Sequence, residues 1–289
     1  MSRRGGLLGL FAWRLLAAAP ALAQPPMWTV SGAGSTLVLF GSVHLLPPGL
    51  DWRPPSLTQA LAKADEVWFE LPVNDATDAV ASSLALERGA FPPGDDLFKH
   101  LTALQGDRLR RAAQSLGLSA PALAGMRPWL AEVTLSLAAD MRAGAQPGQG
   151  VEEALQTSAP ATAVRRAFET PGQQIGYLAG AAMADQIASL DETLTEIADR
   201  PDAYRQLVDE WMAGDLAGLQ ADALEPLRKA SPALYRRLMT DRNRRWAAAL
   251  QQRLTHRGVI VVIVGMGHLI GPDGVPALLR AKGFKVDGP

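Results

Sequence analysis

The chain has 289 residues, of which 48% are hydrophobic, and its 28 basic and 29 acidic side chains give a formal net charge of −1. This length and apolar content allow a sizeable buried core, and the balanced charge argues against a nucleic-acid-binding protein. The sequence contains no cysteine, which excludes disulfides, thiolate zinc sites and cysteine nucleophiles, so any metal must be held by nitrogen and oxygen.

The first 23 residues have the layout of a secretory signal peptide. Arg3 and Arg4 precede an apolar stretch, and small residues end it at Ala23, where we expect cleavage. Arg14 interrupts the apolar region, which leaves an uncleaved anchor and a true start at Met27 as alternatives. We therefore expect an exported, periplasmic protein. No later segment has the roughly 20 uninterrupted apolar residues of a membrane-spanning helix, so the mature chain is expected to lack one.

Two short strands are predicted around the turn at residues 31–34, and the second contains the apolar run 37–40. A short helix, capped by Ser56 and ending near Ala64, leads to a strand at 67–69 that ends at Glu70. The beginning of the mature chain is thus a strand, helix, strand unit.

The middle of the chain is predicted to be mainly helical, with Pro128 in the first turn of one helix and another helix beginning at Val151. A short strand is expected at 162–169. Residues 258–265 return to strand, because six of these eight residues are β-branched valine or isoleucine. A helix from about 275 and a strand at 284–286 end the chain.

The fold class follows from the two apolar strands, 37–40 and 259–264, which must be covered on both faces. We predict an α/β protein with a central mixed sheet flanked by helices. A large helical insertion, about 75–256, separates the N-terminal and C-terminal strands. All of this lies in a single domain that spans residues 24–289.

Two strand ends carry the same Gly-x-x-His-Leu pattern, at Gly41 and His44 and again at Gly265 and His268. The chain has only four histidines. Ligands in open α/β sheets bind at the carboxyl ends of the strands, and Glu70 ends a third strand. We expect two imidazoles and one carboxylate to meet there, with glycine supplying the backbone angles of a sharp turn.

Such a set of side chains suits zinc, manganese, iron or cobalt, with positions open for water and substrate. A bound metal would lower the pKa of water and polarise a carbonyl group. Without a metal, a histidine paired with Glu70 could act as a general base. The alternatives are that the histidines are ordinary turn residues and that Glu70 pairs with a cation or is exposed.

We consider four further residues as parts of a catalytic site. Glu169 ends the strand at 162–169 and is expected, together with Gly41 and Gly265, to support the metal ligands without binding the metal, although it could simply begin the next helix. Arg242 and Asn243 are candidate donors to a developing oxyanion, although arginine on a solvated helix is commoner. Ser42 lacks the Gly-x-Ser-x-Gly pattern of a nucleophilic serine.

The chain resembles the TraB/GumN proteins, which are related to the Tiki metalloproteases. The resemblance rests on both Gly-x-x-His motifs, on Glu70, and on segments along nearly the whole mature chain, including "MRPWLAEVTLS", "ETPGQQIGYL", "RNRRW" and "GMGHLIGPDGVPALLRAKGFKV". It implies an α/β fold with a helical insert and, for the Tiki branch, a divalent-metal peptidase using manganese or cobalt. Glu152 departs from the pattern, because relatives usually have aspartate there.

Our leading hypothesis is an exported metal-dependent hydrolase that acts on a peptide or protein substrate. His44, His268 and Glu70 would hold manganese or cobalt, with zinc as a further option, and Glu70 is either a ligand or the general base. One alternative is a non-catalytic periplasmic binding or polysaccharide-assembly factor. Another is a metal-free esterase-type hydrolase that uses histidine and glutamate. The sequence predicts no oligomeric state.

Overall fold

The computed structural model describes residues 24–289, so the predicted signal peptide at 1–23 lies outside the described residues. A six-stranded sheet has the order β4-β3-β5-β2-β1-β6. The strands are β1 (Met27–Ser31), β2 (Ser35–Ser42), β3 (Glu66–Phe69), β4 (Val164–Ala167), β5 (Gly258–Gly265) and β6 (Lys285–Asp287). Neighbours from β4 to β2 run parallel, whereas β1 is antiparallel to both β2 and β6. The sheet is therefore mixed, as predicted.

Helices surround this sheet and fill the middle of the chain. They are α1 (Pro55–Ala62), α2 (Asp75–Gly89), α3 (Ala103–Ser115), α4 (Ala120–Ala124), α5 (Pro128–Ala143), α6 (Val151–Ser158), α7 (Pro171–Ala179), α8 (Met183–Asp199), α9 (Ala203–Ala213), α10 (Leu216–Leu219), α11 (Glu225–Ala230), α12 (Pro232–Tyr235), α13 (Asp241–Arg253) and α14 (Val275–Ala281). Short turns of other helix types are η1 (Leu97–Lys99), η2 (Gln220–Leu224), η3 (Arg236–Thr240) and η4 (Met266–His268). None of these helices has the length and apolar character needed to cross a membrane.

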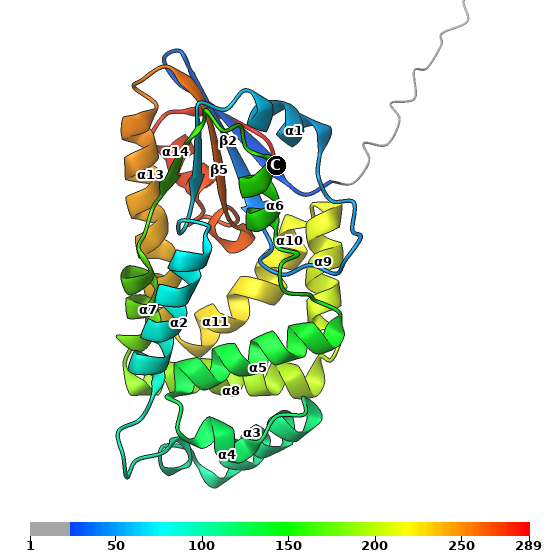
Figure 1. Ribbon diagram of the computed structural model, residues 1–289, viewed down its shortest axis with the longest axis vertical. Coiled ribbons are helices and arrows are strands. Elements are labelled where there is room, and N and C mark those ends of the chain that lie inside the picture. The colour runs from blue at the N-terminus through cyan, green and yellow to red at the C-terminus, as the bar shows by residue number, and fades with distance from the viewer. Residues whose placement is uncertain (1–23) are drawn as a thin grey trace, which may run out of the picture.

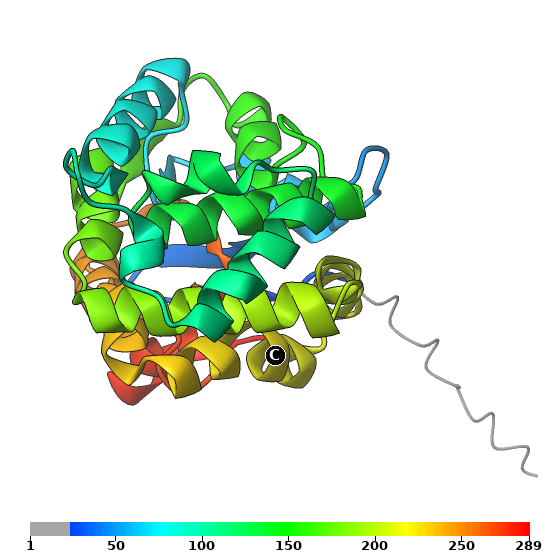
Figure 2. The ribbon, with the colours of Figure 1, turned by 90° about the horizontal axis from the view of Figure 1, so that it is seen from below.

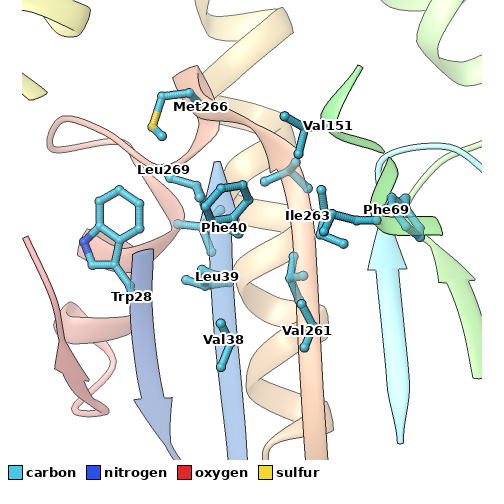
Figure 3. Packing of buried hydrophobic residues seen from close by; sticks show 14 of the residues in the cluster. Trp28, Val38, Leu39, Phe40, Phe69, Val151, Val261, Ile263, Met266 and Leu269 are labelled. Atoms are coloured by element: carbon cyan, nitrogen blue, oxygen red, sulfur yellow. The ribbon is translucent and has the colours of Figure 1, made fainter. Parts of the chain in front are cut away.

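The two apolar strands lie side by side at the centre of the sheet. β2 and β5 pair in parallel from Ser35 opposite Gly258 to Ser42 opposite Gly265. Residues 37–40 of β2 and 260–264 of β5 are buried. Figure 1 shows α13 and α14 on one side of the sheet and α1 and α6 on the other, and Figure 3 shows the packed side chains. The prediction of interior strands covered by helices is confirmed, and the register places Gly265 opposite Ser42, so the two Gly-x-x-His motifs begin one residue apart.

The helical insertion lies beyond the carboxyl ends of the central strands. Figure 1 shows α5 and α8 across the lower end of the sheet with α3 and α4 beneath them, and Figure 2 shows this end from below. A hydrophobic cluster separate from the sheet core holds α3, α5 and α8 together through Leu109, Leu135 and Leu190. The insertion thus has its own core and faces the edge of the sheet where the candidate residues lie.

The predicted start of α1 was wrong in one detail. The helix begins at Pro55, and its N-cap is Pro54, with no side chain capping the helix. Ser56 therefore lies inside the first turn. Proline is favoured at the first helical position because its φ angle is already helical and its missing N–H would have had no partner there.

Candidate functional site

The carboxyl ends of β2, β3 and β5 bring three predicted residues together. Glu70 directly follows β3, His44 follows β2 by two residues, and His268 ends η4 after β5. A Cβ atom placed on Gly265 would lie 3.1 Å from Glu70 Oε1, 3.7 Å from His44 Nε2 and 3.8 Å from His268 Cδ2. All three side chains therefore lie within 4 Å of one point, as expected for neighbouring parallel strands.

The two glycines serve close packing and not the sharp turn that we predicted. Neither Gly41 nor Gly265 has a positive φ angle, and Gly265 has φ −48° and ψ 135°. A Cβ atom on Gly41 would lie 2.7 Å from Met266 Sδ. The N–H of Gly265 donates to Glu70 Oε1 at 2.8 Å. A side chain at 41 would therefore require the end of the Met266 side chain to move, and Met266 Cα, at 3.0 Å, leaves little further room.

Arg242 is buried at the centre of the site, where the π-helical turn η3 joins α13. Its Nε and Nη2 donate to Glu169, with distances from 2.9 to 3.2 Å. Nη2 also donates to Glu70 Oε2 at 2.5 Å, and Nη1 lies 3.0 Å from His268 Nε2. One guanidinium therefore connects both carboxylates and one of the two histidines.

His268 is fixed in one orientation by Asn243. Asn243 Nδ2 donates to the Asp273 carbonyl at 2.8 Å, which turns its Oδ1 toward His268 Nδ1 at 2.6 Å. Because an amide oxygen only accepts hydrogen bonds, Nδ1 carries the proton and Nε2 has a free electron pair. Burial lowers the pKa of His268 to about 3, so the ring is neutral at pH 7.

Glu70 is ionised despite its burial. Burial raises its pKa, but His268, Arg242, His44 and the Gly265 N–H together lower it to about 2. Since His268 is neutral at pH 7, we attribute the ionised state there mainly to the guanidinium of Arg242. The result is a buried carboxylate whose charge is held by a cation.

His44 has a different environment from His268. Its side chain is 70% exposed, and its Nδ1 lies 2.7 Å from Oε1 of Glu152, whose side chain is only 16% exposed. Ser42 Oγ donates to the same carboxylate oxygen at 2.6 Å. The Glu152 carboxylate raises the pKa of His44, although water around the exposed ring weakens this effect.

Three residues of the site were not predicted from the sequence as site residues. Glu152 Oε1 contacts His44 Nδ1, and Gln174 Nε2 donates to Glu70 Oε2 at 3.2 Å. Trp246 packs on His268 with ring centroids 4.4 Å apart, and its Nε1 donates to Glu169 at 3.2 Å. The available signals were the first turn of a predicted helix for Glu152 and the motifs "ETPGQQ" and "RNRRW" for the other two.

The donors suit a divalent metal, but the resting arrangement does not yet form a complete ligand cluster. Within residues 24–289, no three histidine or acidic side chains stand together in a way that could hold an ion. Arg242 Nη1 lies against the free electron pair of His268 Nε2, so an ion that binds this nitrogen would have to replace that contact. The bonds from Arg242 to Glu169 keep the guanidinium close to His268, so an ion could bind Nε2 only if Nη1 moved away from it.

The charges of the site favour a cation. Glu70 and Glu169 pair with the guanidinium of Arg242, Glu152 pairs with His44, and His268 is neutral. A bound dication would neutralise the two excess negative charges, whereas protonation of His44 would neutralise only one of them.

The fold and the site define an α/β protein with paired histidines at the ends of two parallel strands. The chain belongs to the TraB/PrgY/gumN family, whose family model matches residues 26–288. The comparisons with curated proteins and with solved structures found no match.

Proposed function

We propose that the protein is an exported hydrolase that cleaves a peptide bond with the help of a bound divalent metal. The observation that carries this proposal is the convergence of His44, Glu70 and His268 around Gly265. Both imidazoles have their Nδ1 atoms engaged, with Glu152 and with Asn243. Metal-ligating histidines usually have such partners on their second nitrogen.

The metal would be held by His44, His268 and Glu70, whose nitrogen and oxygen donors suit manganese, cobalt or zinc. Such an ion supplies an activated water molecule and polarises the carbonyl group of the substrate. Its positive charge would offset the excess of carboxylates described above. Export is proposed from the leader pattern at residues 1–23.

The surrounding residues have separate tasks in this proposal. Asn243 keeps the free electron pair of His268 at Nε2, directed into the site. Glu169 holds Arg242 by its Nε and Nη2 atoms. Nη1 donates to the Leu238 carbonyl at 3.1 Å and lies 3.0 Å from His268 Nε2, so an ion that takes His268 Nε2 would release one N–H of Nη1 for an oxygen that gains negative charge during the reaction. Asn243 has its amide N–H directed at the Asp273 carbonyl, so we assign the oxyanion role to Arg242.

A metal-free hydrolase is the second candidate, and the contact between Arg242 Nη1 and His268 Nε2 at 3.0 Å favours it. In this form His268 remains paired with Arg242, and His44 is the exposed base. His44 Nε2 would take a proton from water, and Glu152 would stabilise the resulting imidazolium. Esters would then be the preferred substrates.

The mature protein, incubated with manganese, cobalt or zinc and then desalted, tests these candidates by elemental analysis. We expect one ion per chain, lost in His44→Ala and in His268→Ala. His256→Ala is the matched control, because His256 is exposed and lies outside the site. Hydrolysis of fluorogenic peptides and esters is measured in parallel, with and without a chelator.

The outcomes separate the candidates. Metal binding together with chelator-sensitive peptide cleavage supports the metallopeptidase. Ester cleavage that survives the chelator but is lost in His44→Ala supports the metal-free form. Absence of both binding and hydrolysis would leave a non-catalytic binding or assembly factor.

A further inference from the structure

The N-terminus of α6 makes an unusually close contact with the segment that carries His44. Gly150 is the N-cap of α6, and a Cβ atom placed on it would overlap the carbonyl oxygen of His44 and lie 3.3 Å from the carbonyl carbon. Both obstacles belong to the backbone, so no side-chain rotation would relieve the overlap. Any residue larger than glycine at 150 must push the helix away from His44.

Further backbone bonds fix the same two segments to each other. The N–H of Val151 donates to the Val43 carbonyl at 3.3 Å, and the N–H of Gln146 donates to the Leu46 carbonyl at 3.1 Å. From the helical insertion, Tyr204 Oη donates to the Leu45 carbonyl at 3.1 Å. Hydrogen bonds thus hold the backbone on both sides of His44, although the His44 side chain is exposed.

The close contact between α6 and the His44 segment brings the Glu152 carboxylate next to His44. Glu152 lies in the first turn of α6, and its Oε1 accepts hydrogen bonds from Ser42 Oγ at 2.6 Å and from His44 Nδ1 at 2.7 Å. With Nδ1 engaged, the ring directs Nε2 toward the point near Gly265. An exposed imidazole without this partner would rotate among several positions.

We propose that Glu152 is the positioning residue that fixes the tautomer and direction of the His44 ring. Glycine at 150 allows α6 to approach the His44 backbone closely enough for Glu152 to reach the ring. The inference rests on the proposed function for its catalytic meaning, because it assigns Glu152 to the ligand or base at the site. The contact itself holds for either the metal-dependent or the metal-free form.

The test compares Glu152→Leu with Glu153→Leu. Glu153 is the next residue of the same helix turn, and it is exposed. Co²⁺ affinity is measured by calorimetry, and the ¹⁵N chemical shifts of the histidine rings are measured in the metal-free protein. We expect Glu152→Leu to weaken Co²⁺ binding by about 10-fold to 100-fold and to shift the proton of the neutral His44 ring from Nδ1 toward Nε2. Glu153→Leu should change neither.

Two further variants keep the test decisive if Glu152→Leu does not fold. Glu152→Asp keeps the charge on a shorter side chain, so its Co²⁺ affinity should fall between those of the wild type and Glu152→Leu. Gly150→Ala should resemble Glu152→Leu, because the helix is displaced. Wild-type Co²⁺ affinity and ring shifts in these variants would overturn the inference.

The ring shifts separate this inference from the proposed function. If the wild type binds no Co²⁺, the metal-dependent proposal fails, yet a proton on His44 Nδ1 that depends on Glu152 still supports the positioning role. If Co²⁺ binds but the ring shifts are the same in Glu152→Leu and the wild type, the positioning role fails alone.

Discussion

Replacing Arg242 by methionine should cost the protein much of its stability. The Arg242 side chain is 7% exposed, and the Glu70 and Glu169 side chains that it pairs with are 10% and 2% exposed. A methionine side chain fills most of the volume of the arginine side chain but leaves the two buried carboxylates without a cation. Breaking a buried ion pair by removing one partner costs about 3–5 kcal/mol, so we expect a loss of that size at pH 7.

The loss should depend on pH in a defined direction. In the wild type the pKa of Glu70 is lowered to about 2, so its stabilising contribution is present above pH 4.5 and is lost as the pH falls through 2. In Arg242→Met, burial without the cation raises the carboxylate pKa instead. The variant then takes up protons at a higher pH than the wild type, and the difference in stability should shrink between pH 7 and pH 4.

Urea unfolding followed by tryptophan fluorescence at pH 7 and pH 4 measures both effects. Arg244→Met on the same helix is the control, because the Arg244 side chain is 64% exposed and lies 3.7 Å from Asp241. Its loss should stay below about 0.5 kcal/mol. A loss for Arg242→Met of less than about 1 kcal/mol at pH 7, or one equal at both pH values, would refute the account of Arg242 as the counter-charge of the site.

Two further predictions concern the core of the insertion and the end of β2. Burial raises the pKa of Glu132 to about 7, against the opposing hydrogen bond from Ser189. The stability that its neutral form retains below pH 4.5 is therefore lost as the pH rises through 7. Glu132→Gln should gain roughly 1–3 kcal/mol over the wild type at pH 8 and nothing at pH 4, measured by urea unfolding. An equal gain at both pH values would contradict this. Gly41→Ala should lose about 1–3 kcal/mol because its methyl group meets Met266, and an unchanged melting temperature would show that Met266 adapts freely.

The strand ends could be predicted because they depend on local signals. An apolar run indicated β2 and a run of β-branched residues indicated β5, and the rule for parallel sheets placed His44 and His268 at one edge. The contacts of Arg242 gave no such signal, since it lies 172 residues from Glu70 and 73 residues from Glu169 along the chain. Only the packing of α13 against the sheet determines which carboxylates it meets.

The reason for Gly41 and Gly265 also required the structure. A glycine after a strand is compatible with a turn, a close approach or a backbone hydrogen bond, and these differ only in what stands opposite. At Gly41 it is Met266, and at Gly265 it is the carboxylate of Glu70. The motif predicted the right positions for the wrong physical reason.

The repeated Gly-x-x-His pattern gives two histidines that are not equivalent. His268 is buried, bound to the neutral amide of Asn243, and its low pKa keeps it uncharged. His44 is exposed, bound to the carboxylate of Glu152, and its pKa is raised. The raised pKa of His44 keeps a proton on its ring to a higher pH than on an ordinary histidine, and the proposed metal would have to displace that proton. Binding of the proposed metal would therefore release a proton from His44, whereas His268 already has a free electron pair at Nε2. The two histidines of the repeated motif thus differ chemically because α6 supplies a carboxylate, Glu152, to His44, whereas α13 supplies an amide, Asn243, to His268.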